Sequence, residues 1–292
     1  MIFEMTSVVV VIQAGGDGTR LWPLSTTKRP KQFLKTGKYS FFQQTVQRAQ
    51  KLRERFDVRF VLLGNDHTKG LLLKQCREVD FVPDDILIQP CNRNTAPALI
   101  GVAAYIEMVY GSKIPTCFMP CDHVFGDSST VCRHLAEAVR LTEEKAFVSL
   151  VVNPEKYNSQ YGYYFGSADT SEAFFVARPS LGVFEQMKEK GLHPFWDCGV
   201  FVTTASFLLG KAVEGDRDFA RRCKETVRQA VKSDLFLIFN PVLYKALPSV
   251  PITTLVMQKL EKIGIVPLST TWTDIGNWVS FLGWYFKAGW RK

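Results

Sequence analysis

Five consecutive β-branched residues, Val8 to Ile12, run directly into a glycine-rich segment, and this junction constrains the fold more than any other part of the chain. An uninterrupted apolar run of this kind predicts a strand that is buried on both faces, as in a parallel sheet covered by helices. Segments with strand and helix patterns then alternate as far as residue 152. The alternation predicts an α/β fold with a doubly wound, mostly parallel, Rossmann-like sheet.

The expected elements can be given by residue range. No linker or low-complexity stretch divides the chain, so we expect one domain over residues 1–292. Residues 157–165, rich in Tyr and Gly, are expected to lead into an antiparallel edge. Strands are expected at 8–12, 58–63, 85–89, 115–119, 147–152, 174–179, 196–203 and 263–268, and helices at 41–56, 67–77, 95–109, 132–145, 181–190, 205–232 and 275–286.

Composition excludes several classes of protein. The formal net charge of +8 favours an anionic ligand, but Lys and Arg are scattered, so we expect no nucleic-acid binding. The seven Cys follow no disulfide framework, and Cys117 and Cys121 lack the second pair that a zinc site needs. The run from Val8 to Ile12 is too short to span a membrane and has no basic leader. We therefore expect a soluble, cytoplasmic protein with reduced thiols and no membrane partner.

The segment after the first strand, residues 14–20, reads Ala-Gly-Gly-Asp-Gly-Thr-Arg. Glycines let the backbone approach a phosphate chain, and the planar fork of Arg20 can bridge phosphate oxygens. The segment is not a Walker A loop, and the dinucleotide pattern would need a glycine where Leu21 stands. A simple strand-to-loop turn is the alternative. The segment predicts a loop that holds phosphates.

Two further charged residues fit a phosphate site. Lys31 follows Pro30, which restrains the backbone, and a lysine held there could neutralise phosphate charge, although a basic triplet alone is usually solvated surface. Asp122 ends a predicted strand, where ligands bind in doubly wound sheets. A carboxylate at that position can hold Mg²⁺, which bridges phosphates.

Residues 15–25, Gly-Gly-Asp-Gly-Thr-Arg-Leu-Trp-Pro-Leu-Ser, followed by Pro-Lys-Gln-Phe-Leu at 30–34, resemble the bacterial mannose-1-phosphate guanylyltransferases, also called GDP-mannose pyrophosphorylases. Further blocks resemble that family in the family's order. These blocks occupy residues 89–98, 119–124, 161–163, 196–201 and 272–278.

The resemblance implies a fold and an activity. It implies the sheet of the sugar nucleotidyltransferases, with a nucleotide-binding half at residues 1–152 and a sugar-phosphate-binding half at 153–292. It implies an enzyme that joins a nucleoside triphosphate and a sugar 1-phosphate by in-line displacement, giving a nucleotide sugar and pyrophosphate. GTP and mannose 1-phosphate are the favoured substrates, Mg²⁺ is the expected cofactor and a homodimer is one possible assembly.

The resemblance also implies roles for single residues. Asp274 is implied to be the second carboxylate on the metal, although an Asp near a predicted helix start can also be an N-cap. Because the displacement needs no proton abstraction, we interpret His123 as structural. The implied catalytic residues are Arg20, Lys31 and Asp122, and the implied metal ligands are Asp122 and Asp274. The implied nucleotide-binding residues are Ala14, Gly15, Gly16, Gly18, Thr19, Gln89, Asn94 and Thr95. The implied sugar-phosphate-binding residues are Tyr161, Gly162, Arg178, Asp197 and Gly199.

The chain departs from the family pattern around the sugar and the base. Ala177 and Arg178 stand where the family has Glu and Lys, Thr253 replaces an Asp, and Asp197 replaces an Asn. Gln89 replaces a Glu that suits guanine, and an amide also suits thymine or uracil. The alternatives are a thymidylyl- or uridylyltransferase acting on glucose 1-phosphate, or an impaired paralogue that binds a nucleotide sugar and regulates a partner. Since the sequence ends soon after residue 278, we expect no isomerase activity.

Overall fold

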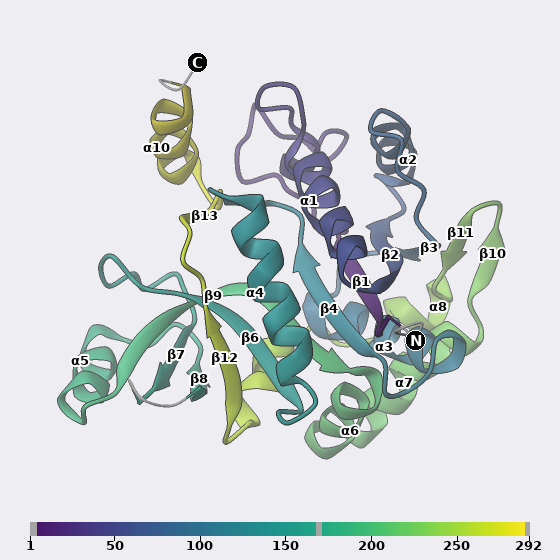
Figure 1. The fold of residues 1–292 in the computed structure, drawn as a ribbon. Coiled ribbons are helices and arrows are strands. Elements are labelled where there is room, and N and C mark those ends of the chain that lie inside the picture. Colours follow the sequence, from purple (N-terminus) through teal and green to yellow (C-terminus); the bar gives the residue numbers. More distant parts are fainter. Residues whose placement is uncertain (1–4, 168–170, 290–292) are drawn as a thin grey trace.

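Strands from both halves of the chain form one large sheet in the computed structural model, which describes residues 5–167 and 171–289 (Figure 1). Its first strands are parallel and lie in the order β3–β2–β1–β4. The predicted central strand is confirmed. The bounds of these strands are β1 Ser7–Gln13, β2 Asp57–Asn65, β3 Asp85–Gln89 and β4 Pro115–Pro120.

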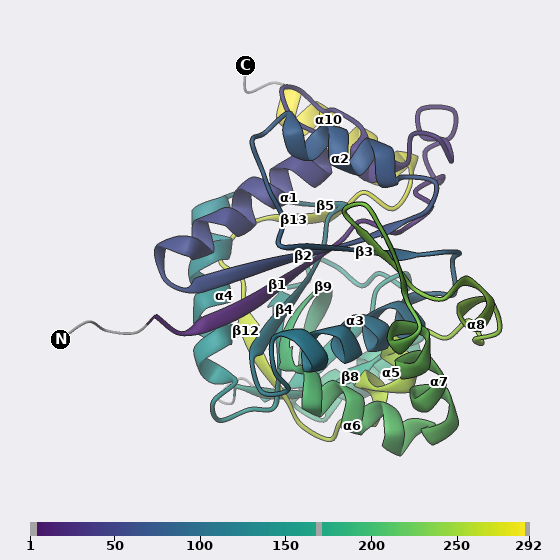
Figure 2. The same ribbon diagram turned by 90° about the vertical axis from the view of Figure 1, so that its right-hand side faces the viewer.

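The valines of β1 explain why both faces of the sheet are covered. Val8 and Val10 belong to one hydrophobic core, whereas Val9 and Val11 belong to the other. Helices α1 and α2 lie on one side of the strands, and α3, α6 and α7 lie on the opposite side (Figure 2). The bounds are α1 Phe41–Gln50, α2 Lys69–Arg77, α3 Thr95–Val109, α4 Ser128–Leu141, α5 Leu181–Glu189, α6 Ala205–Gly215 and α7 Arg217–Arg228.

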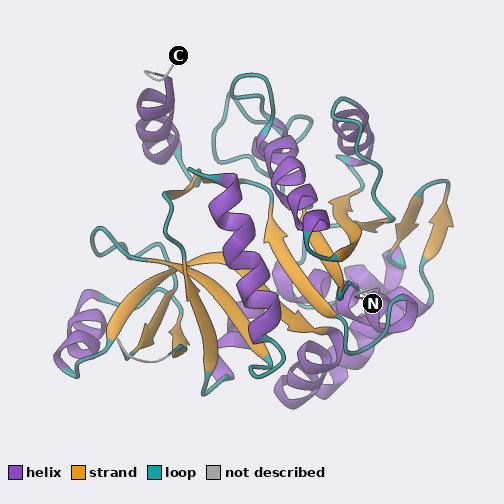
Figure 3. Cartoon of the chain, in the orientation of Figure 1, coloured by secondary structure: helices purple, strands orange, loops and turns teal. Residues whose placement is uncertain are grey.

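The second half continues the sheet with mixed pairing (Figure 3). Strand β9 is antiparallel to β4 and β6, and β12 is parallel to β6. Strand β7 pairs with both β8 and β9, so the expected antiparallel edge is confirmed and folds back on the sheet. The doubly wound α/β fold is confirmed. The bounds are β6 Phe147–Val152, β7 Tyr163–Gly166, β8 Glu172–Val176, β9 His193–Thr204 and β12 Ile263–Pro267.

The expectation that residues 205–232 are mostly helical is confirmed, in the form of two helices of which the second ends at Arg228. Asp216 separates α6 from α7, because its side chain accepts a hydrogen bond from Phe219 N–H and so begins the second helix. The chain then forms β10 (Val231–Ser233) and β11 (Phe236–Ile238), and β11 pairs in parallel with β3. Helices α8 (Pro241–Lys245) and α9 (Ile252–Leu255) follow.

A small second sheet lies beyond the carboxyl end of β4. It consists of β5 (His123–Phe125) and β13 (Trp272–Asp274), which are antiparallel, with Asp274 opposite His123. The final helix, α10, covers Trp278–Gly289 and so begins later than residue 275, the predicted start. Within residues 5–167 and 171–289, none of the helices combines the length and hydropathy that crossing a bilayer requires.

Candidate active site

Buried amide side chains hold the glycine-rich loop from its inner side. Gln32 Nε2 donates hydrogen bonds to the carbonyl oxygens of Ala14, at 3.1 Å, and Gly16, at 2.7 Å. Gln89 Nε2 donates to the carbonyl of Gly15 at 2.8 Å. Within the described chain, the backbone N–H groups of residues 15–20 donate no hydrogen bond to protein. These donors are therefore available to an anion, as a phosphate loop requires.

Two of the glycines are required by their surroundings, and one is not. A Cβ at Gly15 would lie 2.5 Å from Gln89 Nε2. Gly18 has a φ of +56°, and a Cβ there would lie 2.5 Å from the backbone nitrogen of Lys31. A Cβ at Gly16 would meet nothing within 4 Å. Protein packing therefore explains Gly15 and Gly18, but it does not explain Gly16.

Gln89 is tied to the loop by both ends of its amide. Its side chain is buried, its Nε2 donates to Gly15, and its Oε1 accepts a 3.1 Å hydrogen bond from Tyr244 Oη–H. The residue at this position was expected to contact the base. In the structure its amide supports the glycine-rich loop, with Tyr244 as a partner that the sequence did not indicate, and the base contact stays a prediction.

The connection from β3 to α3 also contacts the loop. Asn92 Nδ2 donates a 2.8 Å hydrogen bond to Asp17 Oδ2, and Asn92 Oδ1 accepts from Asn94 N–H. Asn94 has a φ of +65° and caps α3 by accepting from Thr95 N–H at 2.9 Å. Asn94 and Thr95 are exposed at this helix start, beside the loop. The two predicted nucleotide-binding segments are thus adjacent in space.

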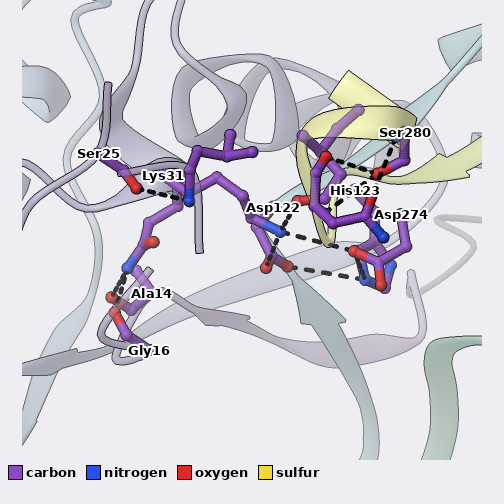
Figure 4. A network of polar contacts seen from close by, with 12 residues as sticks. Ala14, Gly16, Ser25, Lys31, Asp122, His123, Asp274 and Ser280 are labelled. Carbon is purple, nitrogen blue, oxygen red and sulfur yellow. Dashed lines mark hydrogen bonds and ion pairs between the residues drawn. The ribbon is translucent and has the colours of Figure 1, made fainter. Parts of the chain in front are cut away.

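Lys31 and two aspartates form a charged cluster next to the loop (Figure 4). Lys31 Nζ lies 2.9 Å from Asp122 Oδ2 and 3.5 Å from Asp274 Oδ1, and it donates to the carbonyl of Ile275. Burial by itself raises the pKa of Asp122, but the charges of Lys31 and His123 outweigh it and hold that pKa at about 2. Asp122 therefore stays ionised at neutral pH.

His123 completes the cluster. Its Nε2 lies 3.7 Å from Asp122 Oδ1 and 3.7 Å from Asp274 Oδ1. Ligand atoms of these three residues lie within 4.8 Å of one another. Two carboxylates at this separation suit a hard divalent cation, so the donor set fits the Mg²⁺ that the resemblance implies. The sequence led to the interpretation of His123 as structural and did not indicate that its imidazole lies close to both aspartates.

Asp274 belongs to this cluster and does not cap a helix. It is the last residue of β13, opposite His123. The cap of α10 is Asn277, whose Oδ1 accepts a 2.9 Å hydrogen bond from Ser280 N–H. The N-cap alternative for Asp274 is therefore excluded.

The predicted sugar-side residues lie next to the cluster. The Tyr161 ring packs against Trp196 and Trp272, with centroid distances of 5.2 and 5.3 Å. Asp197 N–H donates to the carbonyl of Gly162 at 3.0 Å, and Asp197 Oδ1 accepts from Gly199 N–H at 2.8 Å. Burial raises the pKa of Asp197. This wall combines an aromatic surface with a carboxylate, which is suitable for binding a sugar.

The structure does not bring the two predicted arginines into the cluster. Arg20 and Arg178 are both exposed, and neither forms an ion pair with a described residue. Arg178 has a φ of +45°, an unusual value for a residue other than glycine. Each guanidinium is therefore free to contact a ligand phosphate.

Comparison with known proteins agrees with this geometry. The family model described as nucleotidyl transferase matches residues 9–286. The chain belongs to the nucleotidyl transferase family. Among curated relatives, the alginate biosynthesis protein AlgA of Pseudomonas putida is 32% identical over 281 residues, and the mannose-1-phosphate guanylyltransferase of Escherichia coli is 28% identical over 284 residues.

These matches cover 94% of this nucleotidyl transferase chain but only 57% and 60% of the two relatives, so the chain spans little more than half of their length. A solved structure described as mannose-1-phosphate geranyltransferase from Thermus thermophilus superposes with a TM-score of 0.77 at 26% identity, covering 97% of this chain and 79% of that one. The resemblance to mannose-1-phosphate guanylyltransferases is thereby confirmed, and so is the fold of the sugar nucleotidyltransferases.

Sequence reasoning missed several residues of this nucleotidyl transferase site. Gln32 stood within the recognised Pro-Lys-Gln-Phe-Leu block, but nothing local showed that its amide would hold the loop. Tyr244 lies in a segment without a recognised motif, 155 residues from Gln89. His123 directly follows Asp122 at the end of a strand, and a His beside a carboxylate was the signal that could have revealed it.

Proposed function

We propose that this chain transfers a nucleotidyl group from a nucleoside triphosphate to a sugar 1-phosphate and releases pyrophosphate. GTP and mannose 1-phosphate are the proposed substrates, in keeping with the name of the Escherichia coli relative. The observation that carries the proposal is the cluster of Lys31, Asp122 and Asp274 beside a loop in which the N–H groups of residues 15–20 donate to no protein group in the described ranges. Such an arrangement stabilises charge on transferring phosphates and needs no covalent nucleophile.

The residues of the chain would divide the work as follows. The N–H groups of residues 15–20 and the guanidinium of Arg20 hold the triphosphate, and Lys31 offsets charge that develops as the α-phosphorus is attacked. An oxygen of the sugar 1-phosphate forms the new bond to that phosphorus, and the bond to the departing pyrophosphate breaks. Asp122 and Asp274 would hold Mg²⁺, which would supply positive charge to offset that of the phosphates.

The sugar phosphate is assigned to the second half of the chain, residues 153–292, and the nucleotide to residues 1–152. Tyr161, Gly162, Asp197 and Gly199 would contact the sugar, and the exposed Arg178 its phosphate. Both halves contribute strands to one sheet, which supports this arrangement. Tyr244, from the second half, nevertheless donates a hydrogen bond to Gln89, which holds the loop. The seven cysteines form no disulfide, which supports a cytoplasmic location. The homodimer stays a prediction.

The deciding experiment measures pyrophosphate release for GTP, dTTP and UTP, each with mannose 1-phosphate and glucose 1-phosphate, with and without Mg²⁺. The proposal expects the highest kcat/KM for GTP with mannose 1-phosphate, and none without a divalent cation. Preference for dTTP or UTP with glucose 1-phosphate would support the alternative transferase. Thermal stabilisation by a nucleotide sugar, with no release from any pair, would instead support a regulatory paralogue.

A further inference from the structure

We propose that His123 is a third protein ligand of the divalent cation, bound through Nε2 together with Asp122 and Asp274. This inference rests on the proposed function in one respect, because it takes the charged cluster as the cation site of nucleotidyl transfer. It goes further by adding a nitrogen to a site that was expected to consist of carboxylates alone. The added nitrogen changes which cations the site should prefer.

The position of the imidazole is fixed from two sides. Its Nδ1 lies 2.9 Å from the carbonyl oxygen of Cys198 on β9, and its Nε2 faces the two carboxylates. Gly199, beside the imidazole on β9, has a φ of +71°, a backbone conformation that favours glycine. The ring is therefore held in one orientation before any cation arrives.

The hydrogen bond to Cys198 decides the tautomer of the neutral ring. Because a carbonyl oxygen can only accept and this contact, at 2.9 Å, is shorter than the one from Trp272 Nε1 to the same nitrogen, at 3.4 Å, we infer that Nδ1 carries the proton and donates. With a proton on Nδ1, that nitrogen has no lone pair to accept a hydrogen bond from Trp272 Nε1–H, which lies 3.4 Å away. The two rings instead meet edge to face. The lone pair consequently lies on Nε2 and points at Asp122 and Asp274. A backbone carbonyl on the far nitrogen is the usual support of a metal-binding histidine.

The spacing of the three ligand atoms fits one small ion. Neighbouring ligands of an octahedral cation with bonds of about 2.1 Å are roughly 3 Å apart, and opposite ligands about 4 Å apart. The two Nε2–oxygen separations are both 3.7 Å, between these two values, so the side chains would have to shift slightly to reach octahedral positions. The pairing of β5 with β13, with Asp274 opposite His123, sets this spacing. Small side-chain movements are enough to close it on a cation.

Lys31 and a cation can share the cluster. The ammonium lies 2.9 Å from Asp122 Oδ2, whereas His123 faces Asp122 Oδ1. The two oxygens of Asp122 therefore point to different partners, whereas Oδ1 of Asp274 lies 3.5 Å from Lys31 Nζ and 3.7 Å from His123 Nε2. Lys31 is also anchored by the carbonyl of Ile275. Cation binding on the imidazole side leaves Lys31 in position to act on a phosphate.

An imidazole ligand predicts a particular metal preference. Mg²⁺ favours oxygen ligands, whereas Mn²⁺ and Co²⁺ accept imidazole nitrogen, and Co²⁺ binds mixed nitrogen and oxygen sites more tightly than Mn²⁺. The site should therefore bind Co²⁺ more tightly than Mn²⁺, and Mn²⁺ more tightly than Mg²⁺. Replacing His123 should cost more affinity for Co²⁺ than for Mg²⁺.

The test uses the whole chain with metal alone, without nucleotide. Pulsed electron paramagnetic resonance of the Mn²⁺ complex is expected to show coupling to an imidazole ¹⁴N. His123→Asn keeps a polar group near Cys198 but removes this nitrogen, so the coupling should disappear and Mn²⁺ affinity should fall at least about ten-fold. His193→Asn, an exposed histidine at the start of β9, is the matched control and should change neither.

Three results separate the possibilities. A wild-type Mn²⁺ spectrum without ¹⁴N coupling overturns the inference, and so does unchanged affinity for Co²⁺ in His123→Asn. If that variant does not fold, the wild-type spectrum alone decides. If ¹⁴N coupling is present but no substrate pair yields pyrophosphate, the ligand assignment stands and the proposed function fails.

Discussion

Lys31 Nζ lies 2.9 Å from Oδ2 of Asp122. Lys31 belongs to the segment after the glycine loop, and Asp122 lies just beyond the carboxyl end of β4. The lysine side chain is almost completely buried, with a relative exposure of 5%. A buried ammonium is expensive to hold unless anions compensate it. Asp122 and Asp274 supply that compensation, so Lys31 and the two carboxylates stabilise one another in the folded chain.

Replacing Lys31 should separate catalysis from metal binding. In Lys31→Met the rate of pyrophosphate release should fall about 100-fold or more, because a charge stabiliser of the transferring phosphate is lost. Mn²⁺ should bind more tightly without nucleotide, since the positive charge of Lys31 no longer repels the cation. Steady-state kinetics and Mn²⁺ titration measure the two effects. Lys35→Met, an exposed lysine paired with Glu78, is the control, and a rate within two-fold of wild type for Lys31→Met would refute the assigned role.

Two glycine substitutions should have opposite signatures. Gly18→Ala should lower Tm, because a positive φ costs about 1–2 kcal/mol with a Cβ and because that Cβ would meet the backbone of Lys31. Gly16→Ala meets no protein atom, so Tm should stay close to wild type while KM for GTP rises. Thermal unfolding and kinetics test both variants. Gly182→Ala, also without a close neighbour, controls for the added methyl, and an unchanged KM in Gly16→Ala contradicts close phosphate approach.

Gln89→Glu should weaken the loop. A carboxylate cannot donate to the carbonyl of Gly15, so two acceptors would face each other at a buried position, at a cost of about 1–3 kcal/mol. Lower Tm and a higher KM for every nucleoside triphosphate are expected. A shift in the GTP-to-UTP ratio without loss of Tm would show that residue 89 reads the base. Gln229→Glu, on the exposed end of α7, is the control.

Asp197→Asn should stabilise the fold and impair sugar binding. Burial raises the pKa of Asp197, so its ionised form costs folding free energy above that pKa, and the Asn variant should have the higher Tm at neutral pH. The difference should shrink as pH falls and vanish below about 3.9, where the carboxyl group is protonated in the folded and unfolded states. KM for the sugar 1-phosphate should rise about ten-fold. Asp66→Asn, at an exposed position, should show neither effect.

Arg20→Ala should reduce activity without changing stability. Arg20 is exposed and has no ion-pair partner in the described chain, so thermal unfolding should be unaltered. The rate should fall about 100-fold if its guanidinium binds the triphosphate. Arg77→Ala on α2 is a matched exposed control. Full activity of Arg20→Ala would remove Arg20 from the phosphate site.

Local sequence determined the parts of this protein that depend on neighbouring residues. The β-branched run of β1, the glycines after it and the amphipathic helices each carry a short-range pattern, and the structure confirms them. A phosphate-binding loop could be predicted because strand burial, glycine and arginine occur within a few residues of one another. Helix ends were less certain, since a single capping side chain such as Asp216 decides them.

Tertiary structure decided the contacts between distant segments. Strands β5 and β13 have three residues each, too few to show a periodicity, and only their pairing brings Asp274 to His123. Tyr244 reaches Gln89 because β11 joins the sheet beside β3. A local pattern can show that a residue is polar or apolar, but the partner of a buried polar group is set by how the chain packs. The sequence therefore predicted a phosphate-binding loop, whereas the packing placed Asp274 beside Asp122 and His123.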